Sequence, residues 1–452
     1  MGVRPEVADL YATNARLNGV EFALQRLYLY SMPRQVTIML GNQCNLNCRH
    51  CLQVKNGDLL LQNPEVGRAL KREFTGLYPY LCTVRFLGGE VFVLPGFLEL
   101  IDEVEATVDR PIISINTNGT LIDEEWAQRM VRIPFQNVTI SIDGGTQGTY
   151  EKLRRGAHFE VVIDNIRRIQ SLKRRLGSTF PRLDVFYVLM RSNYREIPQF
   201  LELMHDLDIE EVAFQTMLID NRNLSREPTL TDEVIASTED VKELYDIIQA
   251  IVARESRKFR RISWSGLHSL FEQHGLPASF LNEEDCSLYP GQDAPCKDAT
   301  PANEGATAEN GVPQRNIKLC PNPWSMLQVA ENGDVSICFL SEPVGNIYEM
   351  PLVTIWNSPK AIAKRSEIIA GRYLSSGCSK LYCSWREGKS SAIADTASWR
   401  QLLTAFKDMV ERIRSYPMAS SLSEIPGDLW IGSTSCRGRR ARSPASGLLN
   451  FR

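Results

Sequence analysis

Apolar residues between positions 36 and 217 follow two alternating patterns. Short apolar runs predict six strands, and stretches with apolar residues at helical spacing predict helices between them. The predicted strands are Val36–Leu40, Thr83–Leu87, Pro111–Asn116, Asn137–Ile142, Arg182–Leu189 and Glu211–Gln215. The predicted helices are Pro64–Phe74, Pro95–Val108, Asp123–Val131, Phe159–Leu176 and Ile197–His205. Six such repeats indicate an α/β fold with a parallel sheet and right-handed crossovers, short of the eight units of a full TIM barrel.

The pattern changes after the sixth strand. Residues 218–283 favour helices, most clearly at Thr238–Arg254, and residues 284–316 have the Gly, Pro and Asn content of a linker. Two apolar runs, Ser325–Ala330 and Val335–Phe339, flank an Asn-Gly pair and predict a hairpin. We therefore expect five regions: an N-terminal extension (1–34), the strand–helix core (35–217), a helical segment and linker (218–316), a small module (317–400), and a helix with a disordered tail (401–452).

Composition and charge exclude several classes of protein. The 452 residues include 51 Lys and Arg against 54 Asp and Glu, and this net charge of −3 argues against a nucleic-acid partner. No stretch is apolar enough for a transmembrane helix, and residues 1–30 show no secretory signal, so we expect a cytoplasmic protein without a membrane partner. In that compartment, eleven cysteines indicate metal or redox chemistry rather than a disulfide framework.

Three cysteines directly follow the first predicted strand. Cys44, Cys48 and Cys51 have C-x3-C-x2-C spacing at the strand's carboxyl end, where α/β folds place their chemistry. Three thiolates can hold three irons of a [4Fe–4S] cluster and leave the fourth iron open for another ligand. A structural zinc site with His50 as fourth ligand and a redox pair formed by Cys48 and Cys51 are the alternatives.

This cysteine triplet resembles the signature of the radical S-adenosylmethionine (radical SAM) superfamily. The resemblance implies a partial (β/α)6 TIM barrel whose [4Fe–4S] cluster binds SAM at the open iron. It also implies that the reduced cluster passes one electron to SAM, which breaks into methionine and a 5′-deoxyadenosyl radical that abstracts a substrate hydrogen atom. Such an enzyme needs an external one-electron reductant of the flavodoxin or ferredoxin type.

Motifs on the next strands extend the resemblance. The second strand ends in Gly88, Gly89 and Glu90, which match a motif that binds the SAM amino group. Further SAM contacts implied by the resemblance are Asn116 and Asn118 after the third strand, and Ser141 and Asp143 after the fourth. An arginine for the SAM carboxylate is expected at Arg154 or Arg155, and an adenine neighbour at Met190.

The small C-terminal module holds a second set of cysteines. The spacing of Cys320, Cys338, Cys378 and Cys383 resembles the SPASM/Twitch extensions of radical SAM enzymes and implies one auxiliary [4Fe–4S] cluster. A structural zinc in the same four thiolates is the alternative. The other cysteines have no assigned ligand role: Cys82 is expected to be a buried apolar residue, Cys286 and Cys296 are candidates for a hydrogen-atom donor, and Cys436 lies in the tail.

The sequence predicts an enzyme class more sharply than a substrate. Only about 34 residues precede the first strand, too few for a leader-peptide-binding domain, and one auxiliary cluster is fewer than peptide maturases tend to carry. We therefore expect dehydrogenation or epimerisation of a small polar molecule such as a sugar or an aminocyclitol. The alternatives are a peptide- or protein-modifying SPASM maturase and, more remotely, a zinc-binding interaction protein.

Overall fold

A computed structural model describes four stretches of the chain. They are residues 5–52, 70–281, 320–372 and 404–413, with gaps at 72, 75, 95, 109, 134, 255–257, 339–340 and 405. The predicted linker, the tail, and Cys286, Cys296, Cys378, Cys383 and Cys436 lie outside the described residues. Within the described residues, no helix combines the length and apolarity needed to cross a bilayer.

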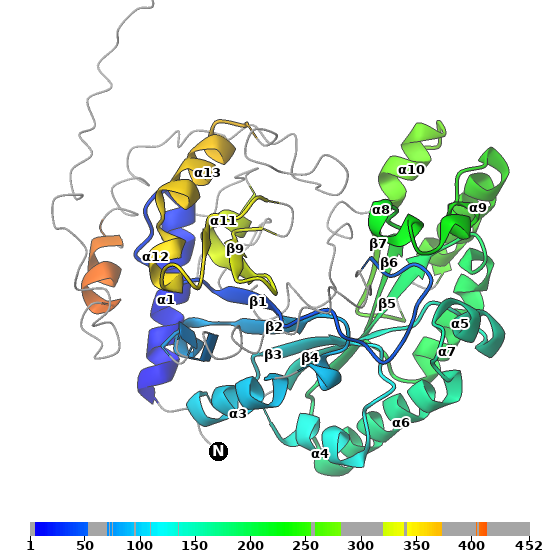
Figure 1. The fold of residues 1–452 in the computed structure, drawn as a ribbon, viewed down its shortest axis with the longest axis horizontal. Helices are drawn as coiled ribbons and strands as arrows, with labels where there is room; N and C mark the ends of the chain where they lie inside the picture. The colour runs from blue at the N-terminus through cyan, green and yellow to red at the C-terminus, as the bar shows by residue number, and fades with distance from the viewer. Residues whose placement is uncertain are drawn as a thin grey trace, which may run out of the picture.

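One curved sheet organises these stretches into a partial barrel (Figure 1). It contains ten strands in the order β10-β9-β8-β1-β2-β3-β4-β5-β6-β7, and all pairs from β8 to β7 are parallel. The strands are β1 (Gln35–Met39), β2 (Thr83–Leu87), β3 (Ile113–Thr117), β4 (Phe135–Ser141), β5 (Arg182–Leu189), β6 (Glu211–Thr216), β7 (Arg261–Ser265), β8 (Met326–Val329), β9 (Asp334–Ser336) and β10 (Gly345–Asn346).

Helices follow most of the parallel strands and cover one side of the sheet (Figure 1). The α-helices are α1 (Pro5–Ala23), α3 (Phe97–Thr107), α4 (Glu124–Arg132), α5 (Gln147–Leu153), α6 (Phe159–Leu176), α7 (Ile197–Asp206), α8 (Asn221–Leu224), α9 (Thr238–Arg254), α10 (Leu267–Gln273), α11 (Asn322–Ser325), α12 (Leu352–Trp356) and α13 (Pro359–Ile369). Short 3-10 helices are η1 (Tyr78–Tyr80), η2 (Val91–Val93), η3 (Tyr194–Glu196) and η4 (Pro228–Glu233).

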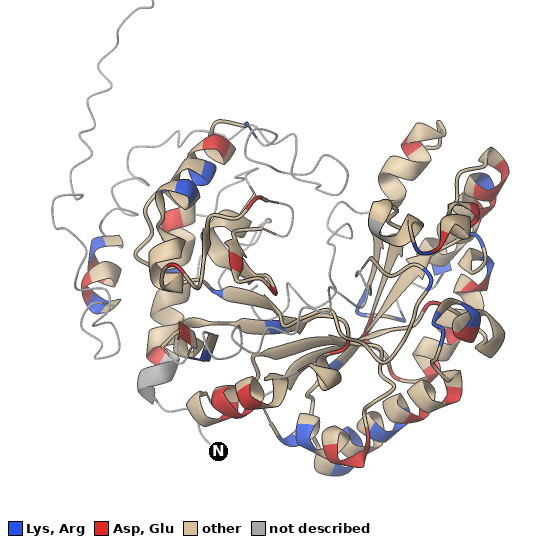
Figure 2. Ribbon diagram, viewed as in Figure 1, with Lys and Arg blue, Asp and Glu red and all other residues tan. Residues whose placement is uncertain are grey.

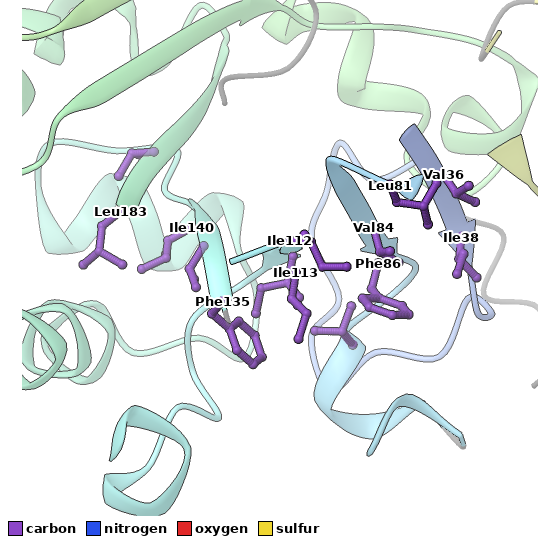
Figure 3. Close-up of a cluster of buried hydrophobic side chains, with 14 of the residues drawn as sticks. Val36, Ile38, Leu81, Val84, Phe86, Ile112, Ile113, Phe135, Ile140 and Leu183 are labelled. Atoms are coloured by element: carbon purple, nitrogen blue, oxygen red, sulfur yellow. The ribbon is translucent and has the colours of Figure 1, made fainter. Parts of the chain in front are cut away.

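Side chains on the outer face of the sheet form the apolar core. Side chains alternate along each strand, and aligned residues of neighbouring strands point the same way, so one face collects every second residue. α3 packs on this face, where the Phe97 ring lies 5.5 Å from that of Phe86. Figure 3 shows the resulting cluster of buried side chains, which includes Val36, Ile38, Val84, Phe86, Ile113, Phe135, Ile140 and Leu183.

The opposite, inner face of the sheet is polar. One aligned row crosses five strands, and a second row crosses the four strands β3 to β6. The first row is Gln328, Thr37, Arg85, Ser114 and Asn137, and the second is Asn116, Thr139, Asp184 and Glu211. An inner face of this composition is suited to polar ligands or water rather than to apolar packing.

The outer helices carry residues of both charge signs, whereas the strands at the centre of the sheet carry few (Figure 2). α4 illustrates the pattern: Glu124 and Glu125 occupy its first turn, and Arg129 and Arg132 its last turn. This order complements the helix dipole, and Asp123 caps the helix by accepting a hydrogen bond from Trp126 N.

The small C-terminal module is continuous with the sheet. β8 pairs with β1, and β9 pairs antiparallel with β8 across the predicted Asn332-Gly333 turn, where Gly333 has φ +85°. Arg365 on α13 has a buried guanidinium group. Its Nε donates a hydrogen bond to Pro323 O (2.8 Å), and its Nη1 donates one to Leu27 O (2.9 Å). The residues before β1 are therefore packed against the C-terminal module.

The six predicted strands and the helices Phe159–Leu176 and Thr238–Arg254 are confirmed, with shifts of one or two residues at most strand ends. Residues 64–69 of the predicted helix Pro64–Phe74 lie outside the described residues. The interpretation of 218–283 as purely helical is wrong, because β7 adds a seventh parallel strand there. Cys82 is buried as predicted but is disulfide-bonded rather than a thiol.

Candidate functional site

The predicted cluster loop, residues 41–51, leaves the carboxyl end of β1. Its three cysteines are thiols rather than disulfides: Cys48 is buried, and Cys44 and Cys51 are partly buried. Two of their sulfurs have nitrogen donors nearby. Leu46 N lies 3.4 Å and Asn118 Nδ2 lies 3.8 Å from Cys44 Sγ, and Arg154 Nη1 lies 3.9 Å from Cys48 Sγ. Such donors stabilise thiolates and tune the potential of a cluster that they hold.

The Gly88-Gly89 pair lets the end of β2 approach this loop very closely. Gly89 N donates to Gly41 O (3.0 Å), and Glu90 N donates to Gln43 O (2.7 Å). A Cβ atom at position 89 would lie 1.9 Å from Gln43 O, a distance that no side chain tolerates. The glycines therefore seat the cluster loop on β2, in addition to the SAM contact expected of them.

Glu90 joins the ends of β2 and β3. Its buried carboxylate accepts hydrogen bonds from Thr117 Oγ1 and from Asn118 N, both at 2.7 Å. Burial raises the pKa of Glu90, and these hydrogen bonds oppose the shift. Thr117 was not among the predicted site residues, although it lies between two of them, because its position on β3 turns it away from Asn116.

Asn118 and Asn116 occupy different surroundings. β3 ends at Thr117, so Asn118 lies beyond the strand, where its Nδ2 donates to Asn45 Oδ1 (2.8 Å) in the cluster loop. Asn116 stays in the sheet opposite Thr139, and its buried Oδ1 has no hydrogen-bond partner in the described part of the chain. Ser141 ends β4 on the same inner face.

Asp143 is the centre of a buried charged group below the cluster loop. Its Oδ2 lies 2.7 Å from Arg154 Nη2 and 3.1 Å from His50 Nε2, and its Oδ1 accepts from Val188 N (2.7 Å). Burial opposes ionisation, but the charges of Arg154 and His50 outweigh it and lower the pKa of Asp143 to about 2. The cluster loop, α5 and β5 are thereby tied to one carboxylate.

The structure separates the two candidate arginines. Arg154 is 7% exposed and lies between Asp143 and Cys48, and its Nε is a buried donor with no partner among the described residues. The Arg155 side chain is 49% exposed and pairs with Glu227 (2.9 Å). Of the two arginines, only Arg154 has a buried N–H donor without a partner among the described residues. Arg154 therefore fits the predicted contact with the SAM carboxylate.

Met190 follows β5 and is fully buried. Its N–H donates to Asn193 Oδ1 (2.7 Å), which forms a tight turn over residues 190–193. The turn lies beside the Asp143 group, because Asn193 Nδ2 donates to Asp143 O (3.0 Å). Met190 thus borders the predicted SAM site from the β5 side.

Two of the four predicted auxiliary ligands are described. Cys320 is buried and Cys338 is partly buried, and Asn322 Nδ2 lies 3.9 Å from Cys338 Sγ. Both flank the β8–β9 hairpin, which fixes their relative positions. Cys378 and Cys383, together with the candidate donors Cys286 and Cys296, lie outside the described residues.

The residues of the cluster loop fit a [4Fe–4S] cluster bound by three thiolates. Three thiols, nitrogen donors to two of their sulfurs and the left-over Nε of Arg154 are what a cluster with a carboxylate-bearing ligand requires. Within the described residues, no three His, Cys, Asp or Glu side chains converge closely enough for a single metal ion. A cubane does not need that convergence, because its thiolates are separated by the width of the cluster.

Comparison with known families agrees with this geometry. Residues 38–204 match the radical SAM superfamily, and residues 320–383 match an iron–sulfur cluster-binding domain named SPASM. The first match begins in β1 and includes the cluster loop, and the second begins at Cys320 and ends at Cys383. The two domains imply a SAM-binding [4Fe–4S] cluster and an auxiliary cluster.

Curated relatives match the first of these two domains. Fe-coproporphyrin III synthase of Methanosarcina barkeri is 28% identical over 189 residues, which are 40% of this chain and 44% of that protein. A probable GTP 3′,8-cyclase of Methanocaldococcus jannaschii is 26% identical over 38% of this chain and 56% of its own length. Mycofactocin maturase MftC of Mycobacterium tuberculosis is 27% identical over 38% and 41%. This chain thus spans about half the length of these relatives.

A solved structure supports the fold. SuiB of Streptococcus suis bound to S-adenosylmethionine aligns with a TM-score of 0.51 at 16% identity, covering 76% of this chain and 70% of SuiB. At that identity the similarity concerns the fold alone. With both domain matches and the three-thiol loop on β1, the chain belongs to the radical SAM superfamily and carries a SPASM-type auxiliary-cluster domain.

Proposed function

We propose that this enzyme reductively cleaves SAM at the carboxyl edge of β1–β5 and abstracts a hydrogen atom from a polar substrate bound against the inner face of the sheet. The observation that carries the proposal is a loop of three thiols in which Cys44 lies beside Asn118 and Cys48 lies beside Arg154. When bound, the cluster supplies the electron that converts SAM into the hydrogen-abstracting radical. An external one-electron donor of the flavodoxin or ferredoxin type is part of the proposal.

The chain's own residues orient the reactants. Asp143 fixes Arg154 by an ion pair of 2.7 Å, so that the remaining guanidinium Nε is held ready for the carboxylate of SAM. Glu90 fixes the Asn118 backbone, and Asn118 in turn holds the cluster loop through Asn45. Because these partners are buried and already paired, the site needs little rearrangement before it binds.

The inner face of the sheet supports a polar substrate. Ser114 and Asp184 are buried on this face, and each has a side-chain oxygen that lacks a hydrogen-bond partner in the described part of the chain. Buried oxygens without partners are costly and favour bound water or a ligand with donor groups. A sugar or aminocyclitol that is dehydrogenated or epimerised fits this chemistry. For dehydrogenation, an auxiliary cluster held by the C-terminal module would supply the capacity to take up the second electron.

A peptide or protein substrate is the second candidate. Two similarities favour it: MftC is a mycofactocin maturase, and SuiB has been solved with its precursor peptide SuiA, a structure that aligns here with a TM-score of 0.50. Peptide backbone amides would also satisfy the oxygens of the inner face. Candidate sugars and a short precursor peptide therefore belong in the same product assay.

Anaerobic reconstitution tests the proposed function. The enzyme should contain about eight Fe per chain and release 5′-deoxyadenosine from SAM when reduced, whereas a zinc-binding protein would hold about two Zn. Absence of both iron and 5′-deoxyadenosine would refute the proposal. With substrate, deuterium uptake from D2O at carbon distinguishes epimerisation from dehydrogenation.

A further inference from the structure

A segment beyond the matched radical SAM domain contacts the cluster loop. This clamp segment, residues 223–243, comprises the end of α8, the short helix η4 and the start of α9, all after residue 204. Asn223 Nδ2 donates to His50 O (3.3 Å), and a guanidinium nitrogen of Arg226 donates to Cys51 O. Both bonds reach the backbone of the cluster loop at or next to a cluster cysteine.

Arg49, between Cys48 and His50, makes the ionic part of this contact. Its guanidinium lies 2.9 Å from Glu233 and 3.5 Å from Glu227, and its side chain is only 11% exposed. A partly buried, hydrogen-bonded ion pair is screened less than a surface pair and fixes its partners more firmly.

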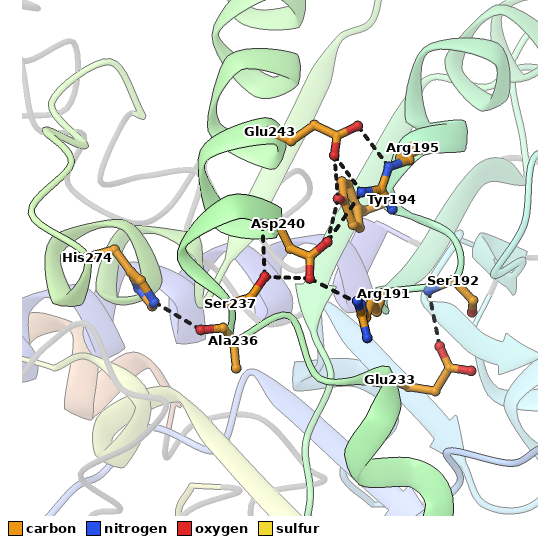
Figure 4. Close-up of polar contacts among 10 residues, drawn as sticks. All are labelled: Arg191, Ser192, Tyr194, Arg195, Glu233, Ala236, Ser237, Asp240, Glu243 and His274. Carbon is orange, nitrogen blue, oxygen red and sulfur yellow. Dashed lines mark hydrogen bonds and ion pairs between the residues drawn. The ribbon is translucent and has the colours of Figure 1, made fainter.

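The second oxygen of Glu233 binds a different element. It accepts a hydrogen bond from Ser192 N (3.1 Å), and the backbone carbonyl of Glu233 accepts one from Arg191 N (2.8 Å). Figure 4 shows the Glu233 carboxylate reaching the Ser192 amide. Ser192 belongs to the turn after β5 that contains Met190. One carboxylate therefore holds the cluster loop with one oxygen and the β5 turn with the other.

The clamp segment is itself anchored on the β5 side. Asp240, at the start of α9, lies 3.1 Å from Arg191 and accepts a hydrogen bond from Tyr194 (3.0 Å), as Figure 4 shows. Glu243, one turn later, binds Arg195 and Tyr194 but contacts neither Ser192 nor the cluster loop among the described residues. Glu243 thus has the same charge as Glu233 and belongs to the same segment, but it does not bridge the cluster loop and the β5 turn.

We propose that Glu233 is a positioning residue that sets the separation between the cluster loop and the β5 turn, and thereby the fit of SAM between them. The inference rests on the proposed function, because it assumes that SAM lies between these two elements. It adds a residue 29 positions beyond the end of the radical SAM match, outside any of its motifs. Glu233 acts through Arg49 and Ser192 and does not itself contact the reacting atoms.

Glu233→Gln, with Glu243→Gln as the matched control, tests the proposal. The introduced amide can accept from Arg49 or from Ser192 but presents donors to the other, so the bridge is broken at constant size. In the reconstituted enzyme without SAM, amide hydrogen exchange should accelerate about tenfold in residues 44–51 and 190–193. SAM affinity should fall about tenfold, with a changed SAM-induced electron paramagnetic resonance spectrum of the reduced cluster and unchanged iron content.

The control and a second variant keep the outcomes separable. Glu243→Gln should match the wild type in the exchange of residues 44–51 and in SAM affinity, because, within the described residues, Glu243 contacts Tyr194 and Arg195 but not the cluster loop. An equal effect of both variants on residues 44–51 would overturn the proposal, as would unchanged exchange in Glu233→Gln. If Glu233→Gln does not fold, Arg49→Gln removes the same ion pair and is judged by the same readouts. Failure of the wild type to cleave SAM would refute the proposed function, whereas the exchange data alone still decide whether Glu233 holds the two elements together.

Discussion

Arg154 lies 2.7 Å from Asp143 and 3.9 Å from the sulfur of Cys48, so one buried guanidinium connects the interior carboxylate to the cluster loop. Arg155, the next residue, points to the surface and pairs with Glu227. The two adjacent arginines therefore have different partners, one at the buried site and one at the surface, although the sequence alone does not distinguish them.

Substitution of these arginines should have unequal effects. Arg154→Gln leaves Asp143 buried without its main counter-charge, which should cost about 3–5 kcal/mol of unfolding free energy and abolish SAM cleavage. Arg155→Gln breaks an exposed pair and should cost at most about 1 kcal/mol. Urea unfolding and 5′-deoxyadenosine release measure both effects. Arg154→Lys keeps the positive charge but loses the several N–H donors of the planar guanidinium. This variant should fold but cleave SAM slowly. Greater damage from Arg155→Gln would contradict the assignment.

Gly89→Ala should dislodge the cluster loop. The added Cβ would meet Gln43 O at 1.9 Å, so the loop must move, and we expect a loss of about 3 kcal/mol or more together with a lower iron content. Gly148→Ala is the matched control, because its Cβ would meet nothing within 4 Å on α5. Alanine is favoured in a helix by about 0.5–1 kcal/mol, so this variant should be as stable as the wild type or slightly more stable. Equal effects of the two variants would show that the close approach is unimportant.

Two cysteine variants should each lose the iron of one of the two clusters. Cys44→Ala should lower the iron content from about eight to about four per chain and eliminate 5′-deoxyadenosine formation. Cys320→Ala should lose the same amount of iron but retain SAM cleavage, because its cluster is the auxiliary one. Iron analysis and uncoupled 5′-deoxyadenosine assays on the two proteins provide the comparison. Retention of all iron in Cys44→Ala would be inconsistent with the three-thiol site.

Glu21 should make the stability of the protein depend on pH. This α1 residue is fully buried and accepts hydrogen bonds from Tyr30 N (2.6 Å) and Ser31 N (3.1 Å), and burial raises its pKa to about 7. At Glu21 the folded protein therefore binds an additional proton between pH 4.5 and 7, so the contribution of Glu21 to stability is largest below this window. It should fall by about 3 kcal/mol as the pH rises through it.

Glu21→Gln tests this dependence, because glutamine does not titrate. The variant should show a smaller decrease in unfolding free energy between pH 4.5 and 7 than the wild type, and not a complete loss of it, because burial also raises the pKa of Asp184. It also loses one acceptor and starts from a lower stability. Glu125→Gln on the exposed side of α4 serves as control and should keep the wild-type slope. Urea unfolding across this pH range provides the measurement, and identical slopes in wild type and Glu21→Gln would disprove the assignment.

Local patterns along the chain predicted much of the fold. The helix at Phe159–Leu176 and the strand at Arg182–Leu189 are found with the predicted bounds, because an amphipathic helix and a half-buried strand must repeat their apolar residues at fixed periods. Cysteine spacing predicted the cluster loop, because three ligands of one cluster are supplied by a short loop. The β7 strand was not predicted, although its five residues alternate between polar and apolar side chains, because so short a signal between helical segments is easily assigned to the helices.

The amino-acid sequence by itself thus determined the class of chemistry and the order of the core elements, both of which depend on neighbouring residues. The tertiary structure alone decided that β8 extends the sheet beside β1, that Arg154 rather than Arg155 faces Cys48, and that Glu233 reaches Arg49 across 184 positions. Those relationships join distant segments, and only the packing of the whole sheet brings them within hydrogen-bonding distance.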